Sequence, residues 1–303
     1  MLRYLGASVI ANAFSATPTT QRSYRKLANR FETWRRTHLG LPDPYVERVR
    51  VLATFAESHL TLSEGDSILE IGTGWVHWES LIMSLVSGGE KTMVDVVDNR
   101  LFPVFKLYAA QLRPLVETVG LPSDRIASAY EVLDTIDRAT TFDEVYTALS
   151  WIYVVDESGT MSNLPSNTFD FIVSSDVLEH IDRAILPPFI ATVFRLLKPG
   201  AVTFHSIDLI DHLSYFDPKA PPKFYYRLNG ATWDRWINSK VQYINRVQRP
   251  EWLSLFERAG FELISEEVKH GPPGIKKINA SYSHLSEPEL ETNMLMLCLR
   301  KPA

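Results

Sequence analysis

The chain has 303 residues, of which 45% are hydrophobic and 22% are charged, so it can fold as one elaborated globular domain or as two. Its net charge of -5 argues against general nucleic-acid binding, and its single cysteine, Cys298, excludes an internal disulfide and a zinc cluster built on thiolates. No apolar run approaches the length of a membrane-spanning helix, and together these properties predict a cytoplasmic protein without membrane insertion.

Residues 1–60 are predicted to form a helical cap. We interpret residues 5–14 as a terminal helix rather than a secretory signal, because Asn12 interrupts the apolar run. Two amphipathic helices are expected between residues 20 and 60, with apolar stripes at Tyr24, Leu27, Phe31 and Trp34, then at Val46, Val49, Leu52 and Phe55. This segment is locally basic, which indicates either solvated helix faces or a docking surface for an anionic partner.

Residues 67–71 are an apolar run that leads into Gly72-Thr73-Gly74-Trp75, a pattern typical of a buried parallel strand that turns into a helix. Such a glycine turn can hold an adenosine-containing ligand, although an ordinary strand-to-helix turn has the same pattern. A dinucleotide site would need a third glycine where Val76 stands, so the pattern disfavours NAD.

Strands and helices alternate after this turn, which predicts a doubly wound, mostly parallel sheet within a domain of residues 61–303. Further strands are expected at residues 93–97, 151–155, 169–174, 201–207, 261–268 and 294–299. Helices are expected from residue 76 to Gly88, over residues 101–150 with breaks at Pro114 and Gly120, at residues 187–197 and at residues 250–256.

Residues 212–250 depart from this alternation and concentrate aromatic side chains. We interpret them as an insertion after the fifth strand, over the carboxyl edge of the sheet. Packing of an aromatic core and a substrate pocket are equally good interpretations of this composition. The aromatic residues are Tyr215, Phe216, Phe224, Tyr225, Tyr226, Trp233, Trp236 and Tyr243.

Residues 164–181 contain a Leu-Pro turn, a Phe-Asp strand start and a Val-Leu-Glu-His-Ile ending. Together with the Glu-Ile-Gly-Thr-Gly motif of residues 70–74, the Lys-Pro-Gly turn at Gly200 and the Ala-Gly-Phe segment at Gly260, this region resembles class I S-adenosylmethionine-dependent methyltransferases. Residues 205–212 and 243–246 are similar to methyltransferase-domain proteins associated with polysaccharide biosynthesis. The sequence departs from that group at Val76-His77, where a His-Pro pair is usual.

This resemblance implies an α/β fold with a Rossmann-like, seven-stranded sheet in the order 3-2-1-4-5-7-6, an antiparallel last strand, and S-adenosylmethionine as the methyl donor. No metal is implied. Glu70 would orient the glycine loop and contact the methionine amino group, and Ser174, Ser175 and Asp176 would line the sulfonium. The remaining cofactor contacts expected in the glycine loop are Gly72, Thr73, Gly74 and Trp75.

Two carboxylates after the second and third predicted strands complete the expected cofactor site. Asp98 ends the second strand, where a carboxylate could accept both ribose hydroxyls, and its alternative role is to cap the following helix. Asp156 follows the third strand and could receive the adenine amino group, with Ser158 and Met161 as rivals for this contact.

Methyl transfer requires alignment and exclusion of water, and it requires a base only when the acceptor still holds its proton. For a hydroxyl acceptor, the expected catalytic residues lie near the ends of the fourth and fifth strands, with His205 or His212 as the base. A structural hydrogen-bonding role is the alternative for each histidine, and the same ligands could hold a divalent metal. The residues in this group are His180, His205, Asp208, Asp211 and His212.

We therefore expect a methyltransferase that acts on a hydroxyl of a small-molecule or glycan acceptor. Two alternatives are a nucleotide-binding Rossmann oxidoreductase and a non-catalytic S-adenosylmethionine-binding module of a biosynthetic complex. The sequence leaves open the identity of the acceptor and the formation of a homo-oligomer.

Overall fold

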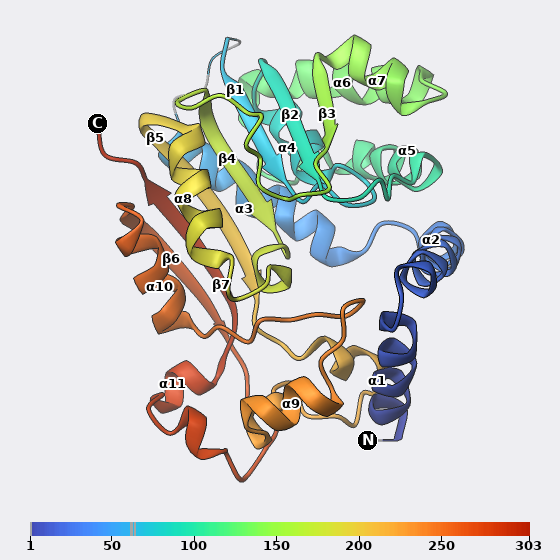
Figure 1. The fold of residues 1–303 in the computed structure, drawn as a ribbon. Coiled ribbons are helices and arrows are strands. Elements are labelled where there is room, and N and C mark those ends of the chain that lie inside the picture. The colour runs from blue at the N-terminus through green and yellow to red at the C-terminus, as the bar shows by residue number, and fades with distance from the viewer. Residues whose placement is uncertain (1, 61–62, 64) are drawn as a thin grey trace. The chain divides into compact units, whose positions relative to one another are not determined.

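The computed structural model describes residues 2–60, 63 and 65–303, which divide into two units (Figure 1). The unit called here the glycine-loop unit contains residues 29–174, 192–204 and 300–303 except those that are not described. The second, called the histidine unit, contains residues 2–28, 175–191 and 205–299. The predicted boundary between a helical cap and the following domain falls at residue 61, outside the described residues, and stays a prediction.

The described strands form a seven-stranded sheet in the order β3-β2-β1-β4-β5-β7-β6, so the expected doubly wound fold is confirmed (Figure 1). β1 pairs in parallel with β2 and β4, and β2 pairs in parallel with β3, whereas β7 runs antiparallel. The strands are β1 (Ser67–Ile71), β2 (Glu90–Asp95), β3 (Trp151–Val155), β4 (Phe169–Ser175), β5 (Leu197–Asp208), β6 (Glu262–His270) and β7 (Thr292–Arg300).

Burial explains why the central strands read as continuous apolar runs. β1 is buried from Ile68 onward, as a parallel strand covered on both faces requires. β5 begins at Leu197, earlier than predicted, because the Gly200 amide donates to the carbonyl of Lys301 and the Lys301 amide donates to the carbonyl of Ala201. The order of the sheet reverses direction between β1 and β4, which is where doubly wound sheets bind ligands.

Several helices begin at a proline or end before a glycine, as at Pro44, Pro250 and Gly40. The stretch predicted at residues 101–150 is divided into three α-helices, with Gly120 at a φ of 80° between the first two. The α-helices are α1 (Leu2–Ser15), α2 (Pro18–Leu39), α3 (Asp43–His59), α4 (Trp78–Val86), α5 (Phe102–Leu112), α6 (Ile126–Arg138), α7 (Phe142–Leu149), α8 (Leu186–Leu196), α9 (Gly230–Trp236), α10 (Arg249–Arg258) and α11 (Glu287–Leu290).

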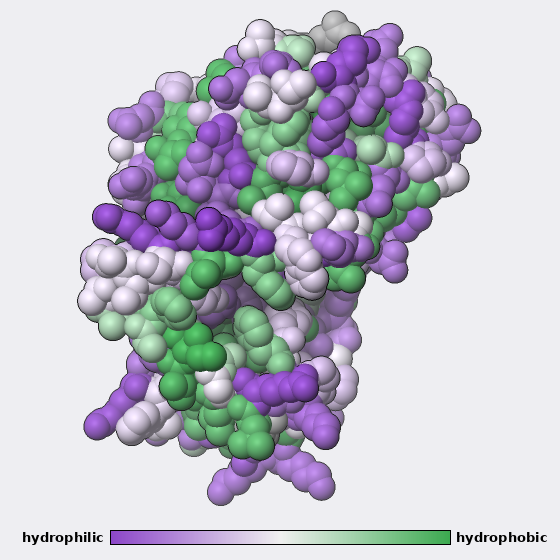
Figure 2. Space-filling view, turned by 90° about the vertical axis from the view of Figure 1, so that its right-hand side faces the viewer, coloured by the Kyte–Doolittle hydropathy of each residue, from purple (hydrophilic) through white to green (hydrophobic). Residues whose placement is uncertain are grey.

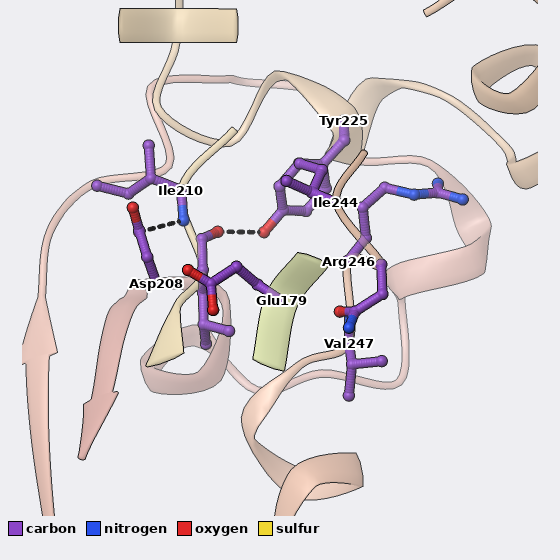
Figure 3. A pocket seen from close by; sticks show the side chains of 9 residues that line it. Glu179, Asp208, Ile210, Tyr225, Ile244, Arg246 and Val247 are labelled. Carbon is purple, nitrogen blue, oxygen red and sulfur yellow. Dashed lines mark hydrogen bonds between the residues drawn. The ribbon is translucent and has the colours of Figure 1, made fainter. Parts of the chain in front are cut away.

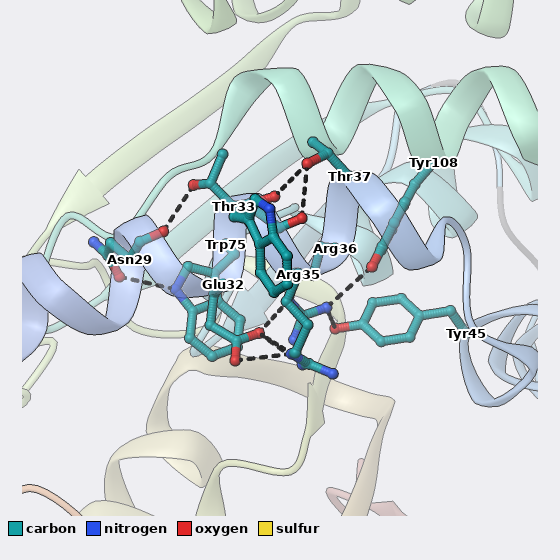
Figure 4. Close-up of polar contacts among 10 residues, drawn as sticks. Asn29, Glu32, Thr33, Arg35, Arg36, Thr37, Tyr45, Trp75 and Tyr108 are labelled. Atoms are coloured by element: carbon teal, nitrogen blue, oxygen red, sulfur yellow. Dashed lines mark hydrogen bonds and ion pairs between the residues drawn. The ribbon is translucent and has the colours of Figure 1, made fainter.

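The apolar stripe predicted on α2 is exposed, although the helix itself is confirmed. Phe31 and Trp34 are each 56% exposed, whereas Arg36 is only 7% exposed. The Arg36 guanidinium donates to the hydroxyls of Tyr45 and Tyr108, at 3.0 and 3.4 Å (Figure 4). Hydrogen-bonded polar groups therefore hold α2 in place, and the pattern of apolar spacing did not identify the buried face.

Hydrophobic side chains are also exposed on α1. Figure 2 shows green surface in the lower part of the view, where α1 lies. The exposed apolar residues of this helix are Leu2, Leu5, Val9 and Ile10. Among the described residues, no helix has both the length and the apolar composition needed to cross a membrane.

The aromatic insertion contributes to the core of the histidine unit. Tyr225, Tyr226 and Trp233 are fully buried in one cluster with Tyr4 of α1, whose ring lies 4.8 Å from that of Phe224. Of the two interpretations of this segment, core packing therefore holds for these residues. Tyr215, Phe216 and Trp236 are exposed.

Candidate functional site

The glycine loop joins β1 to α4 within the glycine-loop unit. Gly72 and Gly74 have φ values of 72° and 58°, which side-chain-bearing residues rarely adopt. The Gly72 amide donates to the carbonyl of Val94 and the Gly74 amide donates to Oδ2 of Asp95, both at 2.8 Å. The end of β2 therefore fixes the path of the loop, and the two glycines are required by its backbone conformation.

The buried side chain of His77 supports the glycine loop. Its backbone has a φ of 44° and its side chain is completely buried. The Nδ1 atom pairs with the Thr73 hydroxyl at 2.5 Å, and the Nε2 atom pairs with the Tyr146 hydroxyl at 2.7 Å. Burial, followed by the charge of Arg100, lowers the pKa of His77 to about 3, so the ring is neutral. Thr73 is therefore engaged in a support contact inside the protein.

Glu70 links the strand to the helix that follows the loop. Its Oε2 atom accepts the Ser80 amide of α4 at 3.0 Å, whereas its Oε1 atom is buried without a hydrogen-bond partner. Burial and the neighbouring charge of Glu79 raise the pKa of the Glu70 carboxyl. One carboxylate oxygen orients α4, and the other is buried without a partner.

The prediction that Asp98 ends the second strand is wrong. β2 ends at Asp95, because the strand starts directly after the Gly88-Gly89 turn, several residues earlier than the spacing suggested. Asp98 is instead exposed and accepts two hydrogen bonds from the Arg100 guanidinium, at 2.9 and 2.8 Å, which lower its pKa. Leu101, and not Asp98, is the N-cap residue of α5.

Asp95 is the carboxylate that the sequence interpretation missed. Its Oδ2 atom accepts the Gly74 amide and its Oδ1 atom accepts the Val97 amide at 3.3 Å. Asp95 is therefore the acidic residue in contact with the glycine loop. The signal that could have identified it is its place as the last residue of a six-residue strand counted from the Gly88-Gly89 turn.

Asp156 shapes the loop after β3. Its Oδ1 atom accepts the Ser158 amide at 3.0 Å and its Oδ2 atom accepts the Met161 amide at 2.7 Å. A cavity of about 240 Å³ lies beside this loop, and its apolar lining includes Val94 and Val154. All three rivals for the adenine contact, Asp156, Ser158 and Met161, line this cavity.

Trp75 is held by α2. Its Nε1 atom donates to the Asn29 side chain at 3.2 Å, and the Arg36 guanidinium lies 4.5 Å from the ring centroid (Figure 4). The Glu32 carboxylate accepts from Arg36 at 2.9 Å on the same helix. The indole of Trp75 is thus part of a polar cluster that joins α2 to the glycine loop.

The three residues expected at the end of β4 fall into different units. Ser174 is completely buried in the glycine-loop unit, while Ser175 and Asp176 belong to the histidine unit. Asp176 has a φ of 56°, a strained conformation for a residue with a side chain, and its amide donates to the Ser206 carbonyl at 2.9 Å. Such strain is typical of functional positions.

His212 and Asp208 form an imidazole–carboxylate pair within the histidine unit. The Nε2 atom of His212 lies 3.2 Å from Oδ2 of Asp208, which also accepts the Tyr215 hydroxyl at 2.5 Å. Burial favours the neutral carboxyl, but the contacts with His212 and Tyr215 outweigh it and lower the pKa of Asp208. The ring of His180 lies 4.8 Å from that of His212.

The Tyr243–Arg246 segment holds the turn that carries His180. The Tyr243 carbonyl accepts from Nδ1 of His180 at 2.8 Å. The Asn245 side chain donates to the carbonyls of Leu178 and Ile181, at 2.7 and 3.1 Å, and its amide donates to the carbonyl of Glu179. Hydrogen bonds therefore join residues 178–181 to residues 243–246, two segments that were recognised separately in the sequence.

We expect Asn245→Ala to destabilise the protein by about 1–3 kcal/mol, because two carbonyls would lose their buried donor. Urea denaturation of both proteins measures this change. Asn238→Ala, which removes a single hydrogen bond to Asp234, is the matched control and should change stability by less than about 0.5 kcal/mol. Equal effects of the two substitutions would contradict the proposed support of the turn.

His205, one of the two expected bases, is a core residue. It is completely buried, and its ring stacks on that of Phe256 at a centroid distance of 5.2 Å and an angle of 24°. Asp211 is also fully buried, and it accepts the Tyr4 hydroxyl at 2.7 Å and caps the short helix after it. The structure thus favours the structural alternative for His205 and Asp211.

Stability should fall on acidification in a way that depends on His205. Burial lowers its pKa to about 3, so below pH 6.5 only the unfolded chain binds a proton at this residue. Between pH 7 and pH 5, wild type should lose about 2 kcal/mol more unfolding free energy than His205→Phe. Urea denaturation at both pH values tests this difference, and an identical pH dependence would show that His205 is not held neutral.

Comparison with known proteins identifies a domain family. The family model described as a methyltransferase domain matches residues 22–266. No curated protein sequence matches the chain.

Solved structures with a similar fold include three methyltransferases, each with low sequence identity. An S-adenosylmethionine-dependent methyltransferase from Mesorhizobium loti shares 15% identity over 82% of this chain and 96% of that chain, with a TM-score of 0.46. One from Methanosarcina mazei shares 16% identity over 82% and 97%, with a TM-score of 0.45. Haemonchus contortus phosphoethanolamine N-methyltransferase 2 shares 15% over 84% and 52%, with a TM-score of 0.46.

Proposed function

Since this chain belongs to the methyltransferase-domain family and is an S-adenosylmethionine-dependent methyltransferase, we propose that it methylates a hydroxyl of a sugar or another small acceptor. The observation that carries the proposal is the short distance of 3.2 Å between Nε2 of His212 and Oδ2 of Asp208. A hydroxyl holds its proton at neutral pH, so its methylation profits from a base, and an imidazole oriented by a carboxylate suits this task.

The residues of the glycine-loop unit fit the cofactor. S-adenosylmethionine supplies a methyl group that is already activated by positive sulfur. We assign Oε1 of Glu70, which is buried without a partner, to the amino group of its methionine part. Asp95, rather than Asp98, would hold the ribose, because Asp95 ends β2 and contacts the glycine loop.

The cavity beside the loop after β3 would accept the adenine. Its volume of about 240 Å³ and its apolar lining suit a flat aromatic ring, and Asp156, Ser158 and Met161 provide polar or sulfur-bearing groups at its wall. The fixed path of the glycine loop would pass beneath the methionine part. Ser174, Ser175 and Asp176 are retained as proposed contacts to the sulfonium.

His212 is the proposed base. Its Nε2 atom lies 3.2 Å from Oδ2 of Asp208 without the geometry of a hydrogen bond, and we assign the proton to Nε2 and the lone pair to Nδ1. Nδ1 would take the proton of the acceptor hydroxyl, and Asp208 would stabilise the imidazolium that forms. His180 would assist through its contact with the His212 ring, and the stacking of His205 on Phe256 in the core supports His212 over His205.

Acceptor chemistry can be tested by measuring release of S-adenosylhomocysteine with panels of hydroxyl, amine and carboxylate acceptors. We expect release with hydroxylated acceptors such as sugars and sugar nucleotides, with a background reaction alone in the absence of acceptor. Turnover confined to amines or carboxylates would overturn the proposal, because those acceptors do not need the proposed base in the same way.

A further inference from the structure

Three potential metal ligands converge in the histidine unit. Glu179, His180 and His212 each offer one ligand atom, and these atoms lie within 4.8 Å of one another. Asp208 adds a second carboxylate, 3.2 Å from His212. Imidazole nitrogens together with carboxylate oxygens are the donors that divalent first-row metal ions prefer in proteins.

Glu179 has no role in a base formed by His212 and Asp208. It is only 2% exposed, and neither oxygen of its carboxylate has a hydrogen-bond partner among the described residues. A buried carboxylate without a partner beside other carboxylates is costly, and a bound cation would remove that cost.

The Glu179 carboxylate lies at a small cavity between Asp208 and Tyr225 (Figure 3). The volume of this cavity is about 10 Å³, which is enough for about one water-sized sphere. Arg246 also lines the cavity, but its guanidinium turns away, with Nη1 donating to the Tyr282 hydroxyl and Nη2 3.7 Å from Asp234. The arginine therefore does not neutralise Glu179.

His180 is oriented as metal-binding histidines usually are. Its Nδ1 atom donates to the Tyr243 carbonyl at 2.8 Å, which leaves the lone pair of the neutral ring on Nε2. A backbone carbonyl in this position fixes both the tautomer and the direction of the ring. The Asn245 side chain holds the same turn through Leu178 and Ile181, so the ligand is supported before any ion binds.

We propose that Glu179, His180 and His212 bind one divalent metal ion, with Asp208 beside it. The inference deepens the proposed function and rests on it in one respect, the role of the ion. A hydroxyl coordinated to the ion would lose its proton more readily, and the proton would pass to the Asp208 carboxylate. In this arrangement the metal ion would act as a Lewis acid. His212 would be one of its ligands and would no longer be the direct base.

Isothermal titration of the chelator-treated full chain with ZnCl₂ and with MnCl₂ tests the site without cofactor or acceptor. We expect one ion per chain in wild type, and an affinity about tenfold or more weaker in Glu179→Gln and in His180→Ala. His270→Ala, which removes an exposed histidine at the end of β6, is the control and should bind as wild type does. Absence of saturable binding in wild type would overturn the proposal, whether or not the variants fold.

A second measurement separates this inference from the proposed function. Methyl transfer to a hydroxylated acceptor should fall on chelation and return when the bound ion is restored, while affinity for S-adenosylhomocysteine stays unchanged. Full activity of the chelated enzyme would overturn the metal site and leave His212 as the direct base. Metal binding without any hydroxyl methylation would instead support the site and contradict the proposed acceptor class.

Discussion

Replacing Asp95 by asparagine is expected to weaken binding of S-adenosylhomocysteine by about 10- to 100-fold, because charge-assisted hydrogen bonds to the ribose hydroxyls would be lost. Asparagine keeps one oxygen that can accept the Gly74 amide, while the longer hydrogen bond from the Val97 amide, at 3.3 Å, is lost. Isothermal titration with S-adenosylhomocysteine measures the change directly.

Asp98→Asn is the matched control for this prediction. Asp98 lies three residues after the end of β2, and Arg100 already pairs with its carboxylate. Its replacement should change the affinity by less than about threefold, as expected for an exposed ion pair. If Asp98→Asn abolished binding and Asp95→Asn did not, the ribose contact would belong to Asp98, as the spacing in the sequence first suggested.

Replacing His212 by alanine is expected to lower kcat by about 100- to 10,000-fold, which is the usual contribution of a general base. The same loss is expected if His212 instead binds a metal ion that activates the acceptor hydroxyl. Affinity for S-adenosylhomocysteine should stay within about twofold of wild type, since no cofactor role is assigned to His212. Single-turnover methyl transfer and titration of the same preparation separate the two effects.

His205→Phe provides the comparison for His212→Ala. The His205 ring is stacked on Phe256 in the core, so a neutral aromatic replacement should leave kcat within about threefold of wild type. The two substitutions thus test which of the two expected histidines performs the chemistry. A large loss of kcat in His205→Phe with full activity in His212→Ala would reverse the assignment.

The fold could be predicted because its signals are local and agree with one another. β3 was predicted at both ends, since the apolar run at residues 151–155 is bounded by the polar residues Ser150 and Asp156. Gly72 and Gly74 were identified from their spacing, and their positive φ values show why glycine is needed there. The strand order could not be worked out from spacing and came from the family resemblance, which is confirmed.

The site was predicted less well because side-chain direction depends on contacts that are distant in sequence. His205 and His212 stand at opposite ends of one segment, but only the partners Phe256 and Asp208 reveal that the first is a core residue and the second is paired. The buried face of α2 was missed for the same reason, since Arg36 is buried by Tyr45 and Tyr108. Periodicity alone cannot show that a polar face is the inner one.

Glu179 was overlooked although it stands next to His180 in a recognised motif. Its importance follows from burial without a partner, which no spacing rule reports. The family match excludes the oxidoreductase alternative and identifies the donor, whereas the association with polysaccharide biosynthesis stays a prediction.

The central claim, methyl transfer to a hydroxyl, is tested most directly by incubating the enzyme with methyl-labelled S-adenosylmethionine and fractionated native extract, then determining the bond that holds the label. The account predicts label in a hydroxylated product through an ether that withstands alkaline hydrolysis. Label released by alkali as from an ester, or recovered on nitrogen, would contradict it.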